Sequence, residues 1–214
     1  MRCRITVATV LVLGAGAAQA DRREASLHAQ VVGGLATSGD ASATASASAP
    51  LGGLAVRASY ATSNLYQYDV ALSLLAAGAA AFPSTTFMPP GRPAVTGPYT
   101  VATQLTRFDG GVTLRPGVVW IPTLRFAAGV QARRASSPVV MSGGSQVTGE
   151  ENTGRGGELG LDVVGVATVG LDHRLNRRLI VGVAGGASYA VPLGGEAFRT
   201  FEVTAHASYY WYPR

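Results

Sequence analysis

Hydrophobic and polar residues alternate along most of this chain. In the segment 159–171 the odd positions are apolar or Gly, while Asp162 and Thr168 stand at even positions. Successive side chains of a β-strand point to opposite faces, so this pattern predicts a strand with one apolar and one polar face. The same period recurs in seven other segments: 27–35, 54–60, 66–74, 107–115, 124–133, 179–189 and 202–211. The pattern therefore predicts eight strands.

The lengths of strands and connections favour a barrel in a membrane. The alternating segments have 7 to 13 residues, and we expect the strands that contain them to have about 10 to 14. A strand tilted across a bilayer needs about 9–11 residues, against about 5 to 6 in a soluble sheet. Long connections at 39–51, 81–100 and 136–157 alternate with short ones at 62–65, 115–122 and 172–177, with a short exception at 191–197. This alternation is typical of an up-and-down barrel with periplasmic turns and outward loops. The uncharged segment 70–82 also allows a buried helix.

The polar faces of the predicted strands collect the charged residues. The interior of an eight-stranded barrel is just wide enough for side chains, and arginines and carboxylates can pair there. We therefore expect a charged lumen formed by Arg57, Asp69, Arg107, Asp109, Arg125, Asp162, Glu202 and His206, with Arg115, Arg133 and Glu158 on the same face. The apolar face carries aromatic residues near strand ends, as in membrane-interface girdles: Tyr60, Tyr66, Tyr68, Tyr189, Tyr209 and Trp211.

Two soluble architectures remain as alternatives. A lipocalin-like barrel would place the charges outside and line a ligand cavity with Leu, Val and Ala. A β-sandwich fits less well, because the expected strands are long and the connections alternate in length.

The chain begins with the features of a secretory signal peptide. Basic Arg2 and Arg4 precede an apolar stretch and the sequence Ala18-Gln19-Ala20, so we expect residues 1–20 to be removed and residues 21–214 to form one barrel domain. The apolar stretch is shorter than the roughly 20 residues of a membrane anchor helix, which is the alternative interpretation. Cys3 is the only cysteine, so disulfides do not stabilise the mature chain. The 17 basic residues are all arginine and lie scattered, which argues against nucleic-acid binding.

The predicted fold resembles the small eight-stranded outer-membrane β-barrel proteins of Gram-negative bacteria, such as the barrel domain of outer-membrane protein A and OmpX. The resemblance covers Ala25 to Tyr212 and is one of pattern. Members usually end in a strand with a terminal aromatic residue that the barrel-assembly machinery reads, and Thr204, Tyr209 and Trp211 fit this feature. His206 stands where glycine is common, and Pro213-Arg214 follow the aromatic end. The resemblance implies an outer-membrane location and contact with membrane lipid and lipopolysaccharide. Because the sequence stops after the last expected strand, we expect a barrel without a peptidoglycan-binding domain.

The pair His206-x-Ser208 is a candidate catalytic site. It resembles the H-x-S motif of outer-membrane lipid A deacylases, but the resemblance extends to these two residues, and no acidic residue follows Ser208. Glu202 lies on the same polar stripe, about 13 Å away at the rise of a strand, which is far for an orienting acid. Hydrogen bonding within the lumen is the alternative interpretation.

Metal and cofactor sites have weak support. His28 and His206 face inward on strands that become neighbours when the barrel closes, and Glu150, Glu151 and Glu158 could hold a divalent cation in the third long loop. Interior hydrogen bonding for the two histidines and a solvated loop for the glutamates are the favoured interpretations, so we expect no metal and no cofactor. Phosphate-binding, dinucleotide-binding and GxSxG motifs are absent from the sequence.

The sequence thus predicts an outer-membrane barrel with a structural or interaction role and a lumen that is filled by charged side chains or forms a narrow pore. A lipid-modifying hydrolase that uses His206 and Ser208 is the second hypothesis, and a soluble ligand-binding barrel is the third.

Overall fold

The computed structural model describes residues 24–39, 46–63, 65–87, 94–136, 139–142, 145–148, 159–192 and 197–211. These residues form β-strands and the turns that join some of them. The expected signal peptide, residues 1–20, lies outside the described residues, as do Glu150, Glu151 and Glu158.

Within the described ranges, no helix is long and apolar enough to cross a membrane.

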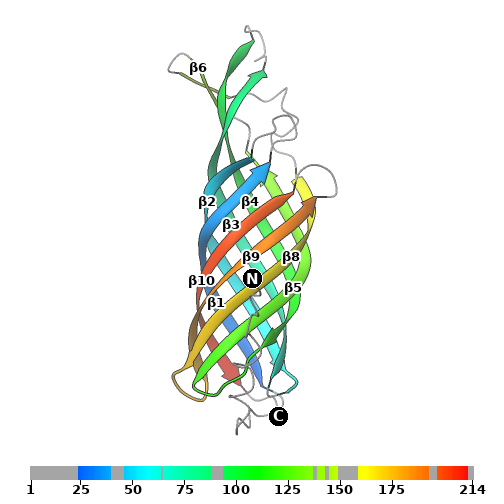
Figure 1. Ribbon diagram of the computed structural model, residues 1–214, viewed down its shortest axis with the longest axis vertical. Coiled ribbons are helices and arrows are strands. Elements are labelled where there is room, and N and C mark those ends of the chain that lie inside the picture. Colours follow the sequence, from blue (N-terminus) through cyan, green and yellow to red (C-terminus); the bar gives the residue numbers. More distant parts are fainter. Residues whose placement is uncertain are drawn as a thin grey trace, which may run out of the picture.

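Eight strands close into a barrel (Figure 1). Each pairs antiparallel with the next along the chain, and the first and last strands pair with Ala25 opposite Trp211. The prediction of an all-β, eight-stranded antiparallel up-and-down barrel is confirmed. The strands are β1 (Ala25–Gly39), β2 (Ser46–Ala61), β3 (Tyr66–Phe87), β4 (Val95–Leu114), β5 (Trp120–Ala135), β8 (Leu159–Arg174), β9 (Leu179–Pro192) and β10 (Phe198–Trp211).

The two ends of the barrel differ. At one end, which we call the turn end, the connections 62–65, 115–119 and 175–178 are short and the first and last strands meet. At the other, the loop end, β3 and β4 continue past the rim as a hairpin (Figure 1). Two short strands, β6 (Val139–Ser142) and β7 (Ser145–Thr148), pair with each other, and β6 adds to the edge of β4 at Tyr99 and Thr100.

The predicted strand boundaries fall short at the loop end. β2 begins at Ser46, inside the expected connection 39–51, and β3 and β4 occupy most of the expected loop 81–100. The expected loop 136–157 contains β6 and β7. The helical alternative for residues 70–82 is wrong, because this segment lies within β3 and pairs with β2 and β4. These segments are rich in Ala, Ser, Gly and Pro, whose weak strand preference is overridden by pairing with neighbours.

Side chains alternate between the barrel wall's two faces as the sequence pattern predicts. In β10, Glu202, His206 and Ser208 are buried, whereas Phe201 and Val203 are exposed. Leu161 and Val163 of β8 are likewise exposed while Asp162 is buried. A soluble monomer rarely exposes a continuous apolar patch above a few hundred Å². Here every barrel strand has exposed apolar residues on its outer face, except in the extensions at the loop end. This arrangement contradicts the lipocalin-like alternative, in which the charges would lie outside.

In β2 the polarity of both faces reverses along the strand. Near the turn end, Leu54, Val56 and Tyr60 are exposed, and Ser59 is buried. Near the loop end the small polar Ser46 and Ser48 are exposed. The residues buried along that stretch are apolar: Ala47, Ala49, Leu51 and Ala55. The loop-end part of β2 therefore has the pattern of a water-soluble barrel, and its turn-end part has that of a membrane barrel.

Candidate functional site: the closed lumen

The structure places the eight expected lumen residues on the inner face of the barrel. Asp69, Arg107, Asp109, Arg125, Asp162, Glu202 and His206 are buried, and Arg57 is half-buried. Arg115 is buried too, and Arg133 is half-buried with its guanidinium 3.5 Å from the Asp162 carboxylate.

Arg107 and Glu202 span the lumen. Arg107 lies on β4 and Glu202 on β10, which are diametrically opposite in the closed ring of eight strands. The guanidinium donates from Nη1 to Oε1 at 2.6 Å and from Nη2 to Oε2 at 2.8 Å, a two-pronged geometry that gives strong hydrogen bonds. Thr200 donates a further hydrogen bond to Glu202 Oε1 at 2.5 Å. This bridge places charged groups across the width of the barrel.

A second arginine links two aspartates beside this bridge. Arg125 Nη2 donates to Asp69 Oδ1 and to Asp109 Oδ1, both at 2.5 Å, and its Nε donates to Asp69 Oδ1 at 2.7 Å. Asp109 Oδ2 also lies 3.4 Å from Arg107 Nε, and Thr113 donates to Asp69 Oδ2 at 2.7 Å. Two arginines and three carboxylates thus form one continuous network, which we call the lumen network. Dense pairing offsets the several kcal/mol that burial costs each ion.

A separate polar cluster surrounds His28 at the turn end. Ser208 Oγ lies 2.6 Å from His28 Nδ1, and Arg57 Nη2 lies 3.3 Å from the same nitrogen. A guanidinium only donates, so Nδ1 accepts, Ser208 donates its hydroxyl proton, and the ring proton of neutral His28 lies on Nε2. There Nε2 faces the hydroxyls of Ser26 and Ser59 at 3.0 and 2.8 Å.

His206 has a different partner from Ser208. Its Nε2 lies 3.1 Å from Asp172 Oδ1, and its ring centroid is 5.9 Å from that of His28. Gly182 makes this approach feasible, since a Cβ there would lie 2.3 Å from the Asp172 carboxylate. The two residues of the candidate pair therefore have separate partners: Ser208 contacts His28, and His206 contacts Asp172. The carboxylate near His206 is that of Asp172 rather than that of Glu202. Among the described residues, no group of three His, Cys, Asp or Glu side chains could hold a metal ion.

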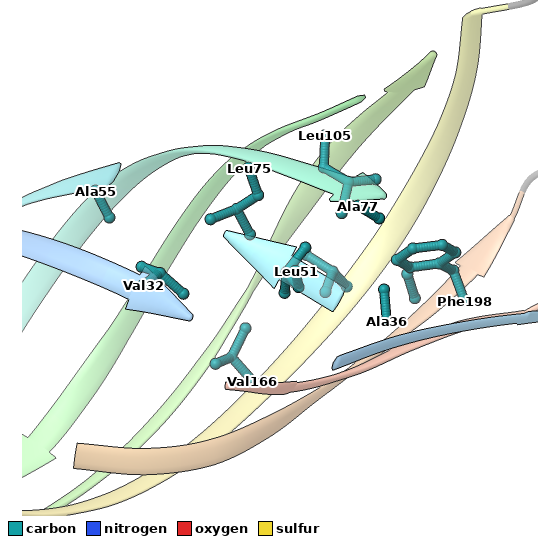
Figure 2. Close-up of a cluster of buried hydrophobic side chains, with 11 residues drawn as sticks. Val32, Ala36, Leu51, Ala55, Leu75, Ala77, Leu105, Val166 and Phe198 are labelled. Atoms are coloured by element: carbon teal, nitrogen blue, oxygen red, sulfur yellow. The ribbon is translucent and has the colours of Figure 1, made fainter. Parts of the chain in front are cut away.

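Apolar side chains occupy the lumen toward the loop end. Figure 2 shows Val32, Leu51, Leu75, Leu105 and Phe198 directed into the barrel from five strands. This cluster was not predicted from the sequence, because the charged residues on the inward faces were expected to fill the lumen. A cavity of about 40 Å³ lies next to the lumen network, lined in part by Arg57, Thr168, Thr204 and His206. Its volume accommodates about two or three water molecules.

No family model matches the sequence, and no curated protein matches it. Solved structures do match. The crystal structure of Neisserial surface protein A aligns with a TM-score of 0.57 at 10% identity, covering 86% of this chain and 96% of that chain. The Ail protein of Yersinia pestis aligns with a TM-score of 0.48 at 9% identity, covering 89% and 100% of the two chains. OprG from Pseudomonas aeruginosa aligns with a TM-score of 0.44 at 10% identity, covering 90% and 97%.

The fold is that of the small outer-membrane β-barrel proteins.

The exposed aromatic residues lie near the ends of the barrel strands. Most of those expected from the sequence are exposed near the turn end: Tyr60, Tyr66, Tyr68, Tyr209 and Trp211. Tyr189 is exposed near the loop end, with the Arg199 guanidinium 5.3 Å from its ring centre. Trp120 is 61% exposed at the start of β5. It was not among the aromatic residues expected from the sequence, because residues 115–122 were predicted to form a connection.

Proposed function

We propose that this chain is an outer-membrane protein with a structural or interaction role rather than a solute channel or an enzyme. The observation that carries the proposal is the inverted polarity of the turn-end part of the barrel. Apolar side chains face outward, while every carboxylate among the described residues is buried. Such a wall is suited to lipid. The closed barrel leaves no backbone edge unpaired, and its exterior presents few polar groups that would need water.

In this proposal the turn end faces the periplasm and the loop end faces outward, as the alternation of short and long connections favours. The wall contacts membrane lipid and, in the outer leaflet, lipopolysaccharide. The β10 residues Thr204, Tyr209 and Trp211 would present the assembly machinery with a terminal strand of the usual kind. Residues 1–20 would direct export.

The outward surface available for interaction is the extended hairpin. β3 and β4 pair beyond the barrel rim as far as Phe87 opposite Val95, and β6 and β7 widen this sheet. Its base has a small apolar core in which the rings of Phe82 and Tyr99 stack with centroids 5.0 Å apart. Because its base has a packed core, the hairpin would hold its tip in a defined position in front of a binding partner.

The experiment that tests the proposal is folding of the mature chain with and without detergent. We expect a fold that forms only in detergent or lipid, and a folded species that migrates differently on a gel before and after heating. A chain that is soluble and folded without detergent would contradict the proposal.

The hydrolase alternative can be tested directly. Ser208 is 1% exposed and its hydroxyl faces His28 inside the lumen, so lipid outside the barrel does not reach it. We expect no deacylation of lipid A by the unmodified protein. Deacylation that disappears in Ser208→Ala would restore the enzyme hypothesis, provided that the variant still folds.

A further inference from the structure

Among the described residues, the exposed charged side chains all carry the same sign. The six acidic residues among the described residues are buried: Glu24, Asp69, Asp109, Asp162, Asp172 and Glu202. The charged side chains that are exposed in this part of the chain are Arg134 and Arg199, near the loop end, and Arg177 and Arg178, in the β8–β9 turn. Each end of the wall therefore carries a pair of arginines with no exposed carboxylate nearby among the described residues.

The β8–β9 turn holds its two arginines in a defined place. Asn176 Oδ1 accepts hydrogen bonds from the backbone N–H groups of Arg178 and Leu179 at 2.8 and 2.9 Å. The Arg178 carbonyl accepts from Tyr210 N–H at 2.8 Å, which ties the turn to β10. The Arg178 guanidinium donates from Nη1 to the Tyr209 hydroxyl at 3.3 Å and is thereby directed to the aromatic residues of the wall.

Exposed apolar residues adjoin these arginines. The neighbouring β4–β5 turn lies against the end of β8, since Arg174 N–H donates to Val119 O at 2.8 Å and the Trp120 ring lies 4.2 Å from the His173 ring. Val119, Trp120 and Leu175 are each more than half exposed. We call Val119, Trp120, Leu175, Arg177, Arg178 and Tyr209 the basic turn patch.

We infer that the basic turn patch binds the headgroup of an anionic phospholipid. This inference rests on the proposed membrane location. In a bilayer, Trp and Tyr lie at headgroup level, and arginines beside them meet phosphate and glycerol oxygens. The guanidiniums of Arg177 and Arg178 supply planar donors for a phosphate, and Val119, Trp120 and Leu175 contact the upper acyl chain. Among the residues that the structure describes, no exposed carboxylate competes for these arginines.

The two tryptophans of the chain provide the probe, since Trp120 and Trp211 both lie at the turn end. The protein is folded into phosphatidylcholine vesicles that contain a minor fraction of phosphatidylglycerol, and either lipid is supplied with brominated acyl chains that quench tryptophan fluorescence on contact. We expect brominated phosphatidylglycerol to quench more strongly than brominated phosphatidylcholine at the same mole fraction. The corresponding enrichment is about fivefold for each contacting arginine, and it weakens at high salt.

The double variant Arg177→Gln/Arg178→Gln should make the two lipids quench equally. The matched control Arg134→Gln/Arg199→Gln removes the same charge at the other end and should retain the preference. Equal quenching in the unmodified protein, a preference that persists in the first variant, or one that is lost in the control variant overturns the inference. A protein that folds in vesicles without the preference contradicts this inference alone, whereas one that does not enter vesicles contradicts the proposed function.

Discussion

Arg107 and Glu202 form a charged bridge across the lumen. Both are buried, and each satisfies the charge of the other across the barrel. Removing Glu202 deprives the buried Arg107 guanidinium of its two-pronged partner and leaves Asp109, 3.4 Å away, as its remaining carboxylate. Replacing both Arg107 and Glu202 by apolar residues instead removes the burial cost together with the attraction.

Glu202→Leu should therefore lower the free energy of unfolding by about 3–5 kcal/mol, and the double variant Arg107→Met/Glu202→Leu should recover much of that loss. Urea unfolding in vesicles, followed by tryptophan fluorescence, measures both. The exposed Arg199→Gln is the control and should change stability by less than about 0.5 kcal/mol. A single variant as stable as the unmodified protein would show that the bridge contributes nothing.

At this scale the sequence predicts which face a side chain occupies but not which partner it meets. Period-two alternation was enough to place Asp69, Arg125 and Glu202 inward. The pairs that form depend on the stagger between strands, which sets His28 opposite Ser208 and Gln30 opposite His206. The contact between Asp172 and His206 also depends on Gly182, because a side chain at that position would collide with both groups. A glycine is neither polar nor apolar in an alternating pattern, so the sequence pattern does not reveal this role.

Among the strands, β2 indicates where the lipid would end if the barrel lies in a membrane as proposed. Ser48 precedes Tyr60 by twelve residues, which at about 3.4 Å per residue and a tilt of about 40° is roughly 30 Å along the barrel axis. The apolar band of such barrels is about 25 Å tall. In the proposed membrane location we therefore expect Ser48 to lie beyond the lipid and Leu54, halfway along, to lie near its middle.

Arginine substitutions on this one exposed face test that depth. Leu54→Arg should cost about 2–4 kcal/mol of unfolding free energy, and Ser48→Arg should cost about 0–1 kcal/mol. Both values come from urea unfolding in the same vesicles, with refolding checked for reversibility. Equal costs at the two positions would contradict the assignment of a lipid boundary within β2.

The same reversal explains why the loop-end strand boundaries were not predicted. The strands were predicted from segments in which every second residue is apolar. Those segments end where Ser and Thr replace Leu and Val at the outward positions. Beyond that level the exterior faces water, and the pairing continues with Ala47, Ala49 and Leu51 inside. The alternation is present in the sequence, but with small residues and opposite polarity.

The whole barrel combines two kinds of interior. Toward the turn end the lumen network and the His28 cluster fill it, and toward the loop end the apolar cluster of Figure 2 fills it. A hydrated ion would have to break charged pairs in the first region and enter an apolar region in the second.

We therefore expect the protein in planar bilayers to show no steady conductance at moderate voltage. Leu51→Ala/Leu75→Ala/Glu202→Ala, which removes obstructions in both regions, should introduce small conductance events if it folds. A persistent conductance of the unmodified protein would contradict a closed lumen.

The central claim, that the apolar face of the wall contacts lipid, is tested most directly on adjacent residues of β8. Val163 is 52% exposed and Val164 is 0% exposed, and Cys3, the only cysteine, belongs to the expected signal peptide. Single cysteines introduced at these two positions are spin-labelled in vesicles, and their collisions with oxygen and with a water-soluble nickel complex are measured. Our account predicts that the label at Val163 is accessible to oxygen and shielded from nickel, while the label at Val164 is immobilised and shielded from oxygen. The reverse order, or nickel access at Val163, would contradict it.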